Sequence, residues 1–200
     1  MSIARDTSRA IRTTFVLWVL TALIYPGVML IVGLVFPYQA NGSLINNAQG
    51  MVVGSALIGQ PFASERYFNS RPSTSSYSTA DSKDDKNGVL KTGVSGASNL
   101  APSNPDLLKR IQEDVGKLKQ AGIQPTADLV YTSGSSLDPH ISIAAANAQV
   151  ERVARARALQ AQDIGTLISK NTDGRFLGIF GEPGVNVLKV NLALDALKTQ

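Results

Sequence analysis

An uncharged apolar stretch near the N-terminus constrains this chain more than any other feature: Thr13 to Phe36, TTFVLWVLTALIYPGVMLIVGLVF. At about 1.5 Å per residue, a helix of this length crosses a hydrocarbon core of about 30 Å. A cleavable signal peptide has a shorter apolar region, roughly 7–15 residues, and a small-x-small cleavage site. Here Tyr38 stands two residues before Ala40, which makes a poor cleavage site. The stretch therefore predicts an uncleaved transmembrane anchor helix over residues 13–36.

The charges on either side of the stretch predict its orientation. Three arginines precede it, and no Lys or Arg follows it until Arg66. Positively charged flanks remain in the cytoplasm. We therefore expect residues 1–12 to form a cytoplasmic tail and residues 37–200 to form an extracytoplasmic domain.

Pro26 lies inside the predicted anchor. It removes the hydrogen bond to the carbonyl of Ala22, so we expect the helix to kink there. Two interpretations stay open. The kink is either tolerated in a passive anchor, or it shapes the helix to pack against other membrane helices, where a neighbour satisfies the freed carbonyl. The chain has no G-x-x-x-G pair, which gives self-dimerisation little support.

The sequence of residues 37–200 predicts strands and helices that are intermixed without strict alternation. The predicted strands are Met51 to Ile58, a short one from Asp128, and two runs joined at Gly181 to Gly184, the last with Leu188, Val190 and Leu192 on one face. The predicted helices are one between Asn104 and Gly122, one over Ile143 to Leu159 and one over Ile164 to Lys170. The polar residues 69–88 are expected to be a surface excursion. The predicted fold class is α+β: a single N-terminal transmembrane helix followed by one mixed α/β extracytoplasmic domain.

One short block, SGSSLDPHIS from Ser133 to Ser142, holds the only histidine of the chain, His140. A nucleophilic serine needs a base within hydrogen-bond reach and a third group that orients the base. One alternative is therefore an exported serine hydrolase that uses Ser135 or Ser136 with His140. The other is structural: a turn of small residues leads into a helix capped by Ser142. The G-x-S-x-G elbow is missing, and the structural interpretation accounts for each residue.

The predicted helix after Ser142 ends in a group of arginines: Arg152, Arg155 and Arg157. Cations suit the negative end of a helix dipole, and Glu151 can pair with Arg155. This favours a solvated face. The alternative is a docking surface for acidic groups of a partner.

The absent motifs narrow the function. Without cysteine there are no disulfides and no thiol catalysis, and a single histidine makes a poor zinc site. Basic runs with interleaved aromatics are missing, so nucleic acid is not an expected partner. There is no phosphate loop; DKNGVLKTG is only superficially like the phosphorylated-aspartate signature of P-type pumps, and VSGASNL is only loosely like a nucleotide-handling loop.

Six blocks in order behind one anchor carry a specific resemblance: GSALIGQPF, YFNSRPS, SGASNLAPSNPDL, SGSSLDPHIS, AQVERVARAR and GEPGVNVLKVNLAL. On these, the chain resembles the C subunit (KdpC) family of the bacterial Kdp-type potassium-transporting P-type ATPase. The resemblance implies a place in the bacterial plasma (inner) membrane, beside a channel-like potassium-binding subunit, a P-type ATP-hydrolysing subunit, a small single-span subunit and membrane lipid. It implies an accessory subunit without catalysis of its own, needed for assembly and activity and often described as a catalytic chaperone that raises the ATP affinity of the hydrolytic subunit. ATP and potassium would be handled by the complex, with no cofactor bound directly by this chain.

The same resemblance, together with the kink, gives the candidate docking or family-motif residues. They are Pro26, Gly54, Ser55, Gln60, Tyr67, Phe68, Arg71, Pro72, Ser98, Asn99, Leu100, Pro102, Asn104, Pro105, Ser133, Gly134, Ser135, Asp138, Pro139, His140, Gln149, Arg152, Arg155, Arg157, Asn186 and Asn191.

Overall fold

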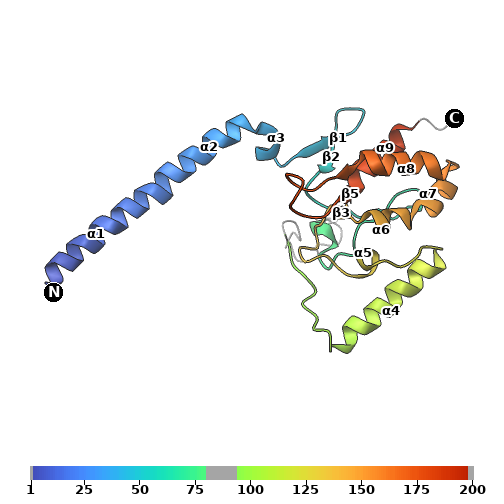
Figure 1. The fold of residues 1–200 in the computed structure, drawn as a ribbon, viewed down its shortest axis with the longest axis horizontal. Helices are drawn as coiled ribbons and strands as arrows, with labels where there is room; N and C mark the ends of the chain where they lie inside the picture. The colour runs from blue at the N-terminus through green and yellow to red at the C-terminus, as the bar shows by residue number, and fades with distance from the viewer. Residues whose placement is uncertain (1, 80–93, 198–200) are drawn as a thin grey trace, which may run out of the picture. The chain divides into compact units, whose positions relative to one another are not determined.

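The computed structural model describes residues 2–79 and 94–197, and the chain divides into two compact units, Met1–Ser43 and Leu44–Gln200. The first unit is mostly one long helix and the second holds all the strands (Figure 1). The predicted surface excursion over residues 69–88 lies partly outside the described residues. Its described part, residues 69–79, is irregular apart from the short 3-10 helix η2 (Ser76–Ser78).

The helix of the first unit runs without a break over Ile3–Val35, which is long and apolar enough to cross a membrane. It consists of α1 (Ile3–Val19), a π-helical turn η1 (Leu20–Ile24) and α2 (Tyr25–Val35), and the short α3 (Pro37–Ala40) follows. The helix starts ten residues before Thr13, so the predicted cytoplasmic tail is helical as well. None of its most apolar part is buried within the protein, as expected of a helix whose side chains face lipid or partner helices.

A π-helical turn lies just before Pro26, where the sequence predicts a kink, and the helix continues through it to Val35. The Tyr25 amide, one residue before the proline, donates to the Leu20 carbonyl five residues back. A π-turn widens the helix locally, which accommodates a residue that has no amide hydrogen.

The second unit contains two small antiparallel sheets. In the first, β1 (Leu44–Asn46) pairs with β2 (Val52–Ser55). In the second, β5 (Gly184–Asn186) lies between β3 (His140–Ile141) and β4 (Thr172–Asp173), with His140 opposite Asn186 and Thr172 opposite Val185.

Several α-helices accompany the strands in the second unit. They are α4 (Pro105–Gln120), α5 (Ala127–Val130), α6 (Ile143–Asn147), α7 (Val150–Arg157), α8 (Ala161–Lys170) and α9 (Val187–Ala196). Of these, α6 and α9 pack directly on β5. The last four of these helices pack together and, with the sheet, enclose one apolar core. Deeply buried core residues include Phe68, Ile141, Ala145, Val153, Ile164, Val185, Val190 and Leu194. Burial of each of the larger side chains among these stabilises the fold by roughly 1.5–3 kcal/mol.

Several predicted helix signals are confirmed. Asn104 caps α4 by accepting from the Asp106 amide at 2.9 Å, Pro105 is its first residue, and Gly122 follows its end with a φ of 70°. Ser142 caps α6 by accepting from the Ala145 amide at 3.2 Å. The predicted helix over residues 143–159 is interrupted after Asn147, so it forms α6 and α7, and α8 begins three residues earlier than predicted.

Two predicted strands are wrong. The segment from Asp128 is the short helix α5, and the segment containing Leu188, Val190 and Leu192 is the helix α9. In α9 the buried residues include Val187, Val190 and Leu194, a helical spacing, whereas the alternating pattern of a strand would have put Asn191 on the solvent face. The first of the two runs joined at residues 181–184 is wrong as well: residues 175–180 form a loop between β4 and β5 with one isolated bridge, Phe176 to Phe180. Of the second run only the start is a strand, β5, and β2 covers only Val52–Ser55 of the predicted Met51 to Ile58.

Candidate functional site

Ser136 lies at the centre of the serine-rich block and holds three segments together. It is almost fully buried and has a φ of 60°. Its hydroxyl donates to the Gly96 carbonyl at 2.6 Å and accepts from the Thr74 amide at 3.0 Å, and the Thr74 hydroxyl lies 2.6 Å away. A hydroxyl committed to these contacts cannot also act as a nucleophile without breaking them.

The neighbouring serines serve the same turn. The Ser135 hydroxyl accepts from the Leu137 amide at 3.1 Å, and the Ser135 carbonyl accepts from the Gly96 amide and the Ser95 hydroxyl. The Ser133 carbonyl accepts from the Ser136 amide, which closes the turn across Gly134. These bonds tie residues 133–137 to residues 95–96.

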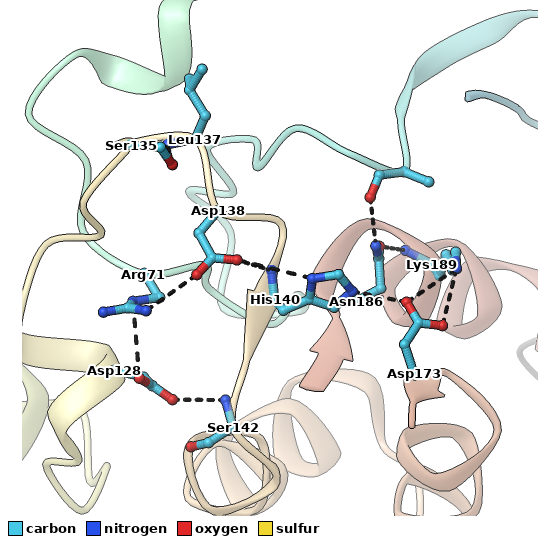
Figure 2. A network of polar contacts seen from close by, with 11 residues as sticks. Arg71, Asp128, Ser135, Leu137, Asp138, His140, Ser142, Asp173, Asn186 and Lys189 are labelled. Atoms are coloured by element: carbon cyan, nitrogen blue, oxygen red, sulfur yellow. Dashed lines mark hydrogen bonds and ion pairs between the residues drawn. The ribbon is translucent and has the colours of Figure 1, made fainter. Parts of the chain in front are cut away.

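His140 lies in β3 and belongs to a network of charges (Figure 2). Its Nε2 atom is 2.8 Å from Oδ2 of Asp173, at the end of β4, and its Nδ1 atom is 3.9 Å from Oδ1 of Asp138. Lys189 of α9 completes the group, with Nζ at 3.4 Å from both carboxylate oxygens of Asp173. The three-stranded sheet brings these residues together because β3 and β4 flank β5, which leads into α9.

The environment of Asp173 favours its charged form. Burial by itself would raise its pKa, but the hydrogen bond from His140 and the charge and hydrogen bond of Lys189 outweigh this effect, so the pKa of Asp173 lies below its ordinary value. At neutral pH Asp173 is therefore a carboxylate that holds the His140 ring and Lys189 in place.

A second group of charges fixes the start of α6. Arg71 makes an ion pair with Asp138 at 3.1 Å and a longer one with Asp128 at 3.9 Å. Asp128 in turn accepts from the Ser142 amide at 2.7 Å, and Asp138 accepts from the His140 amide at 3.0 Å. Figure 2 shows Arg71 between the two carboxylates, so this arginine links α5 to the DPH turn, whose Pro139 carbonyl accepts from the Val187 amide at 3.0 Å.

The structure does not assemble the serine–histidine pair of the hydrolase alternative. Within residues 2–79 and 94–197, no hydrogen bond joins a serine hydroxyl to the His140 ring. Figure 2 places Ser135 beside Leu137, away from the ring. The block is a turn that leads into a capped helix, as the structural interpretation predicted.

The arginines of α7 differ from one another. Arg152 is buried and donates to the carbonyls of Glu65 and Tyr67 at 2.6 and 2.8 Å and to the Gln149 side chain at 2.9 Å. Burial lowers the pKa of Arg152, partly offset by the charge of Glu65. Both the solvated-face and the docking interpretations are therefore wrong for Arg152, since its guanidinium lies inside the domain. The sequence does not reveal that the backbone of residues 65–69 packs on this helix.

Arg157 is buried in the same manner. Its guanidinium donates to the carbonyls of Arg66 and Leu194 and to the Asp195 carboxylate, at 2.6, 3.1 and 2.7 Å, and lies 4.8 Å from the centre of the Tyr67 ring. The Tyr67 hydroxyl donates to the same carboxylate at 3.0 Å. Arg157 too is an internal residue. Arg155 alone of the three is exposed, and the ion pairs of the described residues do not include one between it and Glu151.

Three buried amides attach loops to the helices. Gln149 exchanges hydrogen bonds with the backbone of Asn69, and Asn191 of α9 does the same with Phe68 at 2.8 and 3.0 Å. Asn186 caps α9 through the Lys189 amide and donates to the Ala56 carbonyl at 2.9 Å. The Tyr67–Phe68 segment is therefore held by α7 and α9 together.

The remaining predicted residues also have structural positions. Gln60 donates to the Val53 carbonyl at 3.0 Å, and a side chain on Gly54 would collide with Gln60, at 2.1 Å. The Ser55 hydroxyl accepts from the Leu57 amide, and the Pro72 carbonyl accepts from the Ser133 amide.

Ser98 and Leu100 line a cavity of about 740 Å³ that Thr74, Ser75 and Arg110 also border. Asn99 has a φ of 52°, and Pro102 lies in the turn before α4.

Sequence reasoning missed the acidic partners of the site. Asp128, Asp173 and Asp195 each receive a basic side chain from a distant segment. They are isolated acids without a motif, and no local pattern distinguishes them from surface carboxylates. The described residues contain no group of three His, Cys, Asp or Glu side chains placed to hold a metal ion.

Comparison with known proteins places these features in context. The family described as "K+-transporting ATPase, c chain" matches residues 7–196. The "Potassium-transporting ATPase KdpC subunit 1" of a Nostoc species is 67% identical over 200 residues, covering 99% of each chain. The KdpC subunit of Microcystis aeruginosa is 64% identical, covering 98% of each chain. That of Geobacter sulfurreducens is 45% identical, covering 96% of this chain and 98% of its own.

Proposed function

The chain belongs to the KdpC family of potassium-transporting ATPase subunits, and from this premise we propose that it is a non-catalytic accessory subunit of an ATP-driven, high-affinity potassium uptake complex. In this role it is needed for assembly and activity. One observation carries the proposal: the polar residues that looked chemical in the sequence are used to hold the domain together. Ser136, Arg152 and Arg157 all bond to backbone groups of distant segments.

The architecture supports docking in two places. The helix Ile3–Val35 has its apolar side chains exposed over the whole span, so neighbouring membrane helices can pack on it. Its π-helical turn before Pro26 leaves an irregular surface at mid-span, a feature suited to a specific helix partner. The extracytoplasmic domain contributes the second surface, on which Arg155 is the α7 arginine free to meet acidic groups of a partner.

The proposed partners are those implied by the family: a channel-like potassium-binding subunit, a P-type subunit that hydrolyses ATP and a small single-span subunit. A domain outside the membrane reaches cytoplasmic ATP chemistry only through such partners or through the short N-terminal tail. We therefore place the proposed rise in ATP affinity in coupling through the partner subunits. In this proposal the chain binds neither ATP nor potassium by itself.

Kinetics of the complex with and without this chain test the proposal. Partner subunits purified without it should dissociate more readily, and the preparation that remains should need a higher ATP concentration for half-maximal potassium-stimulated hydrolysis. Adding back the full chain should restore both properties. A deletion preparation with the same subunit content and the same ATP dependence as the complete complex would refute the accessory role. A chain that hydrolyses an ester by itself, with loss of that activity in His140→Ala, would establish the hydrolase instead.

A further inference from the structure

The loop between β4 and β5 is a hairpin with four large apolar side chains in solvent. Phe176, Leu177, Ile179 and Phe180 are 71%, 73%, 72% and 60% exposed. The hairpin projects from the three-stranded sheet on the side away from α7 and α8 (Figure 1). A soluble domain rarely exposes four large apolar side chains in one short loop. Exposed apolar patches of this kind mark binding surfaces.

Four amides of the hairpin donate to carbonyls within it. The Phe176 amide donates to the Phe180 carbonyl at 2.8 Å, and the Phe180 amide donates back at 3.0 Å. The turn between them is closed by the Gly178 amide, which donates to the Arg175 carbonyl at 3.0 Å. These bonds lower the cost of moving the tip out of water, because unpaired backbone groups are expensive in an apolar medium.

The charges at the base of the hairpin cancel. The Arg175 guanidinium contacts both carboxylate oxygens of Glu182, at 3.1 and 3.0 Å. This pair stays in water while the four apolar side chains extend beyond it. An apolar tip above a polar base is the arrangement of segments that insert into the interfacial region of a bilayer.

A bilayer is also close to this domain at all times. Eight residues, 36–43, separate the end of the membrane-spanning helix from the second unit. Even fully extended they reach only about 28 Å, comparable with the dimensions of a 150-residue domain. A stable protein interface needs about 20–30 residues on each side, far more than this tip offers.

We propose that residues 176–180 insert into the outer surface of the lipid bilayer and give the extracytoplasmic domain a second attachment to the membrane. The ligand is the apolar upper part of the acyl chains, not a particular headgroup. This contact is independent of the ATPase partners, so it does not rest on the function proposed above.

Fluorescence quenching in the full chain tests the insertion. Trp18 is the only tryptophan, so Trp18→Phe gives a background without tryptophan fluorescence. In that background Phe180→Trp reports on the hairpin, and Phe176→Trp is a second reporter should the first lower the melting temperature. Tyr131→Trp is the matched control, on an aromatic residue that is exposed elsewhere in the same domain. Each variant is reconstituted into phosphatidylcholine vesicles with bromine on the upper acyl chain.

The fractional loss of tryptophan fluorescence should be at least about twofold larger for the hairpin reporter than for the control. The reason is that bromine quenches only tryptophan in contact with the acyl chains. Equal quenching of reporter and control would overturn the proposal. A reporter that is unquenched in lipid alone and becomes shielded only when the other ATPase subunits are present would also overturn it, in favour of a protein contact.

Discussion

At the scale of single residues, the two buried arginines of α7 show how this domain uses its charges. Arg152 and Arg157 each donate hydrogen bonds to backbone carbonyls of residues 65–67, which are far away in the sequence. Both guanidinium groups lie inside the domain rather than facing a partner. Guanidinium groups suit this role because one side chain offers five donors in a fixed plane. The irregular segment that contains Tyr67 and Phe68 is therefore held without secondary structure of its own.

Replacing Arg157 tests that role. Arg157→Lys should lower the free energy of unfolding by about 2–4 kcal/mol, because lysine cannot reach the Arg66 and Leu194 carbonyls and Asp195 at once. Arg155→Lys on the exposed side of the same helix is the matched control and should change it by less than about 0.5 kcal/mol. Urea unfolding of the full chain in detergent, followed by circular dichroism, measures both. Equal effects of the two substitutions would show that Arg157 is not an internal contact.

The Asp173 carboxylate gives the domain a specific acid sensitivity. Its pKa is lowered in the folded protein, so its contribution to stability is present above the unfolded value of about 3.9 and is lost as pH falls through the lower folded pKa. Thermal melting of wild type and Asp173→Asn should therefore differ most near neutral pH and converge in acid below about pH 4.

Glu113→Gln on the exposed face of α4 serves as the control for this pH series. It should track the wild type at every pH, because Glu113 makes no ion pair within the described part of the chain. A difference between wild type and Asp173→Asn that stays constant down to strong acid would show that the His140–Asp173–Lys189 contacts do not depend on charge.

At the scale of elements, α9 shows where a helix can be mistaken for a strand. Asn186 ends β5 and begins α9, with its carbonyl oxygen Oδ1 accepting from the Lys189 amide at 3.1 Å and its Nδ2 donating to the Ala56 carbonyl at 2.9 Å. One buried side chain thus starts the last helix and fixes the loop after β2. The element depends on this cap because helix ends leave amides unpaired.

Two substitutions separate these roles of Asn186. Asn186→Ser keeps an N-cap oxygen but loses the amide donor, and should cost about 1–2 kcal/mol. Asn186→Ala loses both and should cost roughly 2–4 kcal/mol. Denaturation of the two variants side by side gives the order, and a serine variant as unstable as the alanine variant would mean that the Ala56 contact dominates.

Local signals predicted the elements that local chemistry determines. Asn104-Pro105 and Ser142 were correctly identified as helix starts, because a cap needs only its own neighbours. Leu188, Val190 and Leu192 alternate in the sequence as in a half-buried strand, yet the fold buries Val187, Leu188, Val190, Asn191 and Leu194 and leaves Leu192 half-buried. Tertiary packing decides between the two-residue repeat of a strand and the 3.6-residue repeat of a helix, and the local sequence does not reveal that packing.

The candidate site was predicted unevenly for the same reason. The DPH turn was correctly interpreted as the entry to a helix, since Pro139 and Ser142 act on adjacent backbone. The burial of Arg152 and the pairing of His140 with Asp173 depend on contacts across 87 and 33 residues of sequence. Such contacts exist only once the sheet and helices have assembled, so the sequence predicted surface roles for residues that lie inside.

At the scale of the whole molecule, the chain combines a long exposed apolar helix with a domain whose polar motif residues hydrogen-bond mainly within the domain. Membership in the KdpC family makes it a subunit of a potassium-transporting ATPase. Both observations favour a protein that acts by holding partners in position. We have proposed attachment at three places: the membrane helix, the domain surface and the apolar hairpin.

The arginines before the span predict the orientation of the chain in the membrane. Alkaline phosphatase fused after residue 200 should be active in intact cells, because positive flanks hold the N-terminus in the cytoplasm. A fluorescent protein that folds only in the cytoplasm is the matched control at the same position and should be dark. The reverse pair of results would place the domain beside the ATP-hydrolysing machinery.

Restoration of a complex that lacks this chain tests the central claim most directly. Purified full chain is titrated into the remaining subunits while potassium-stimulated ATP hydrolysis is measured, and the variant Ser135→Ala/His140→Ala is titrated in parallel. If the chain acts by docking, both proteins should restore hydrolysis to the same plateau, with the variant's midpoint shifted by at most about tenfold, or 1.4 kcal/mol. A variant that binds and melts like the wild type but restores no hydrolysis would contradict the account and assign chemistry to these residues.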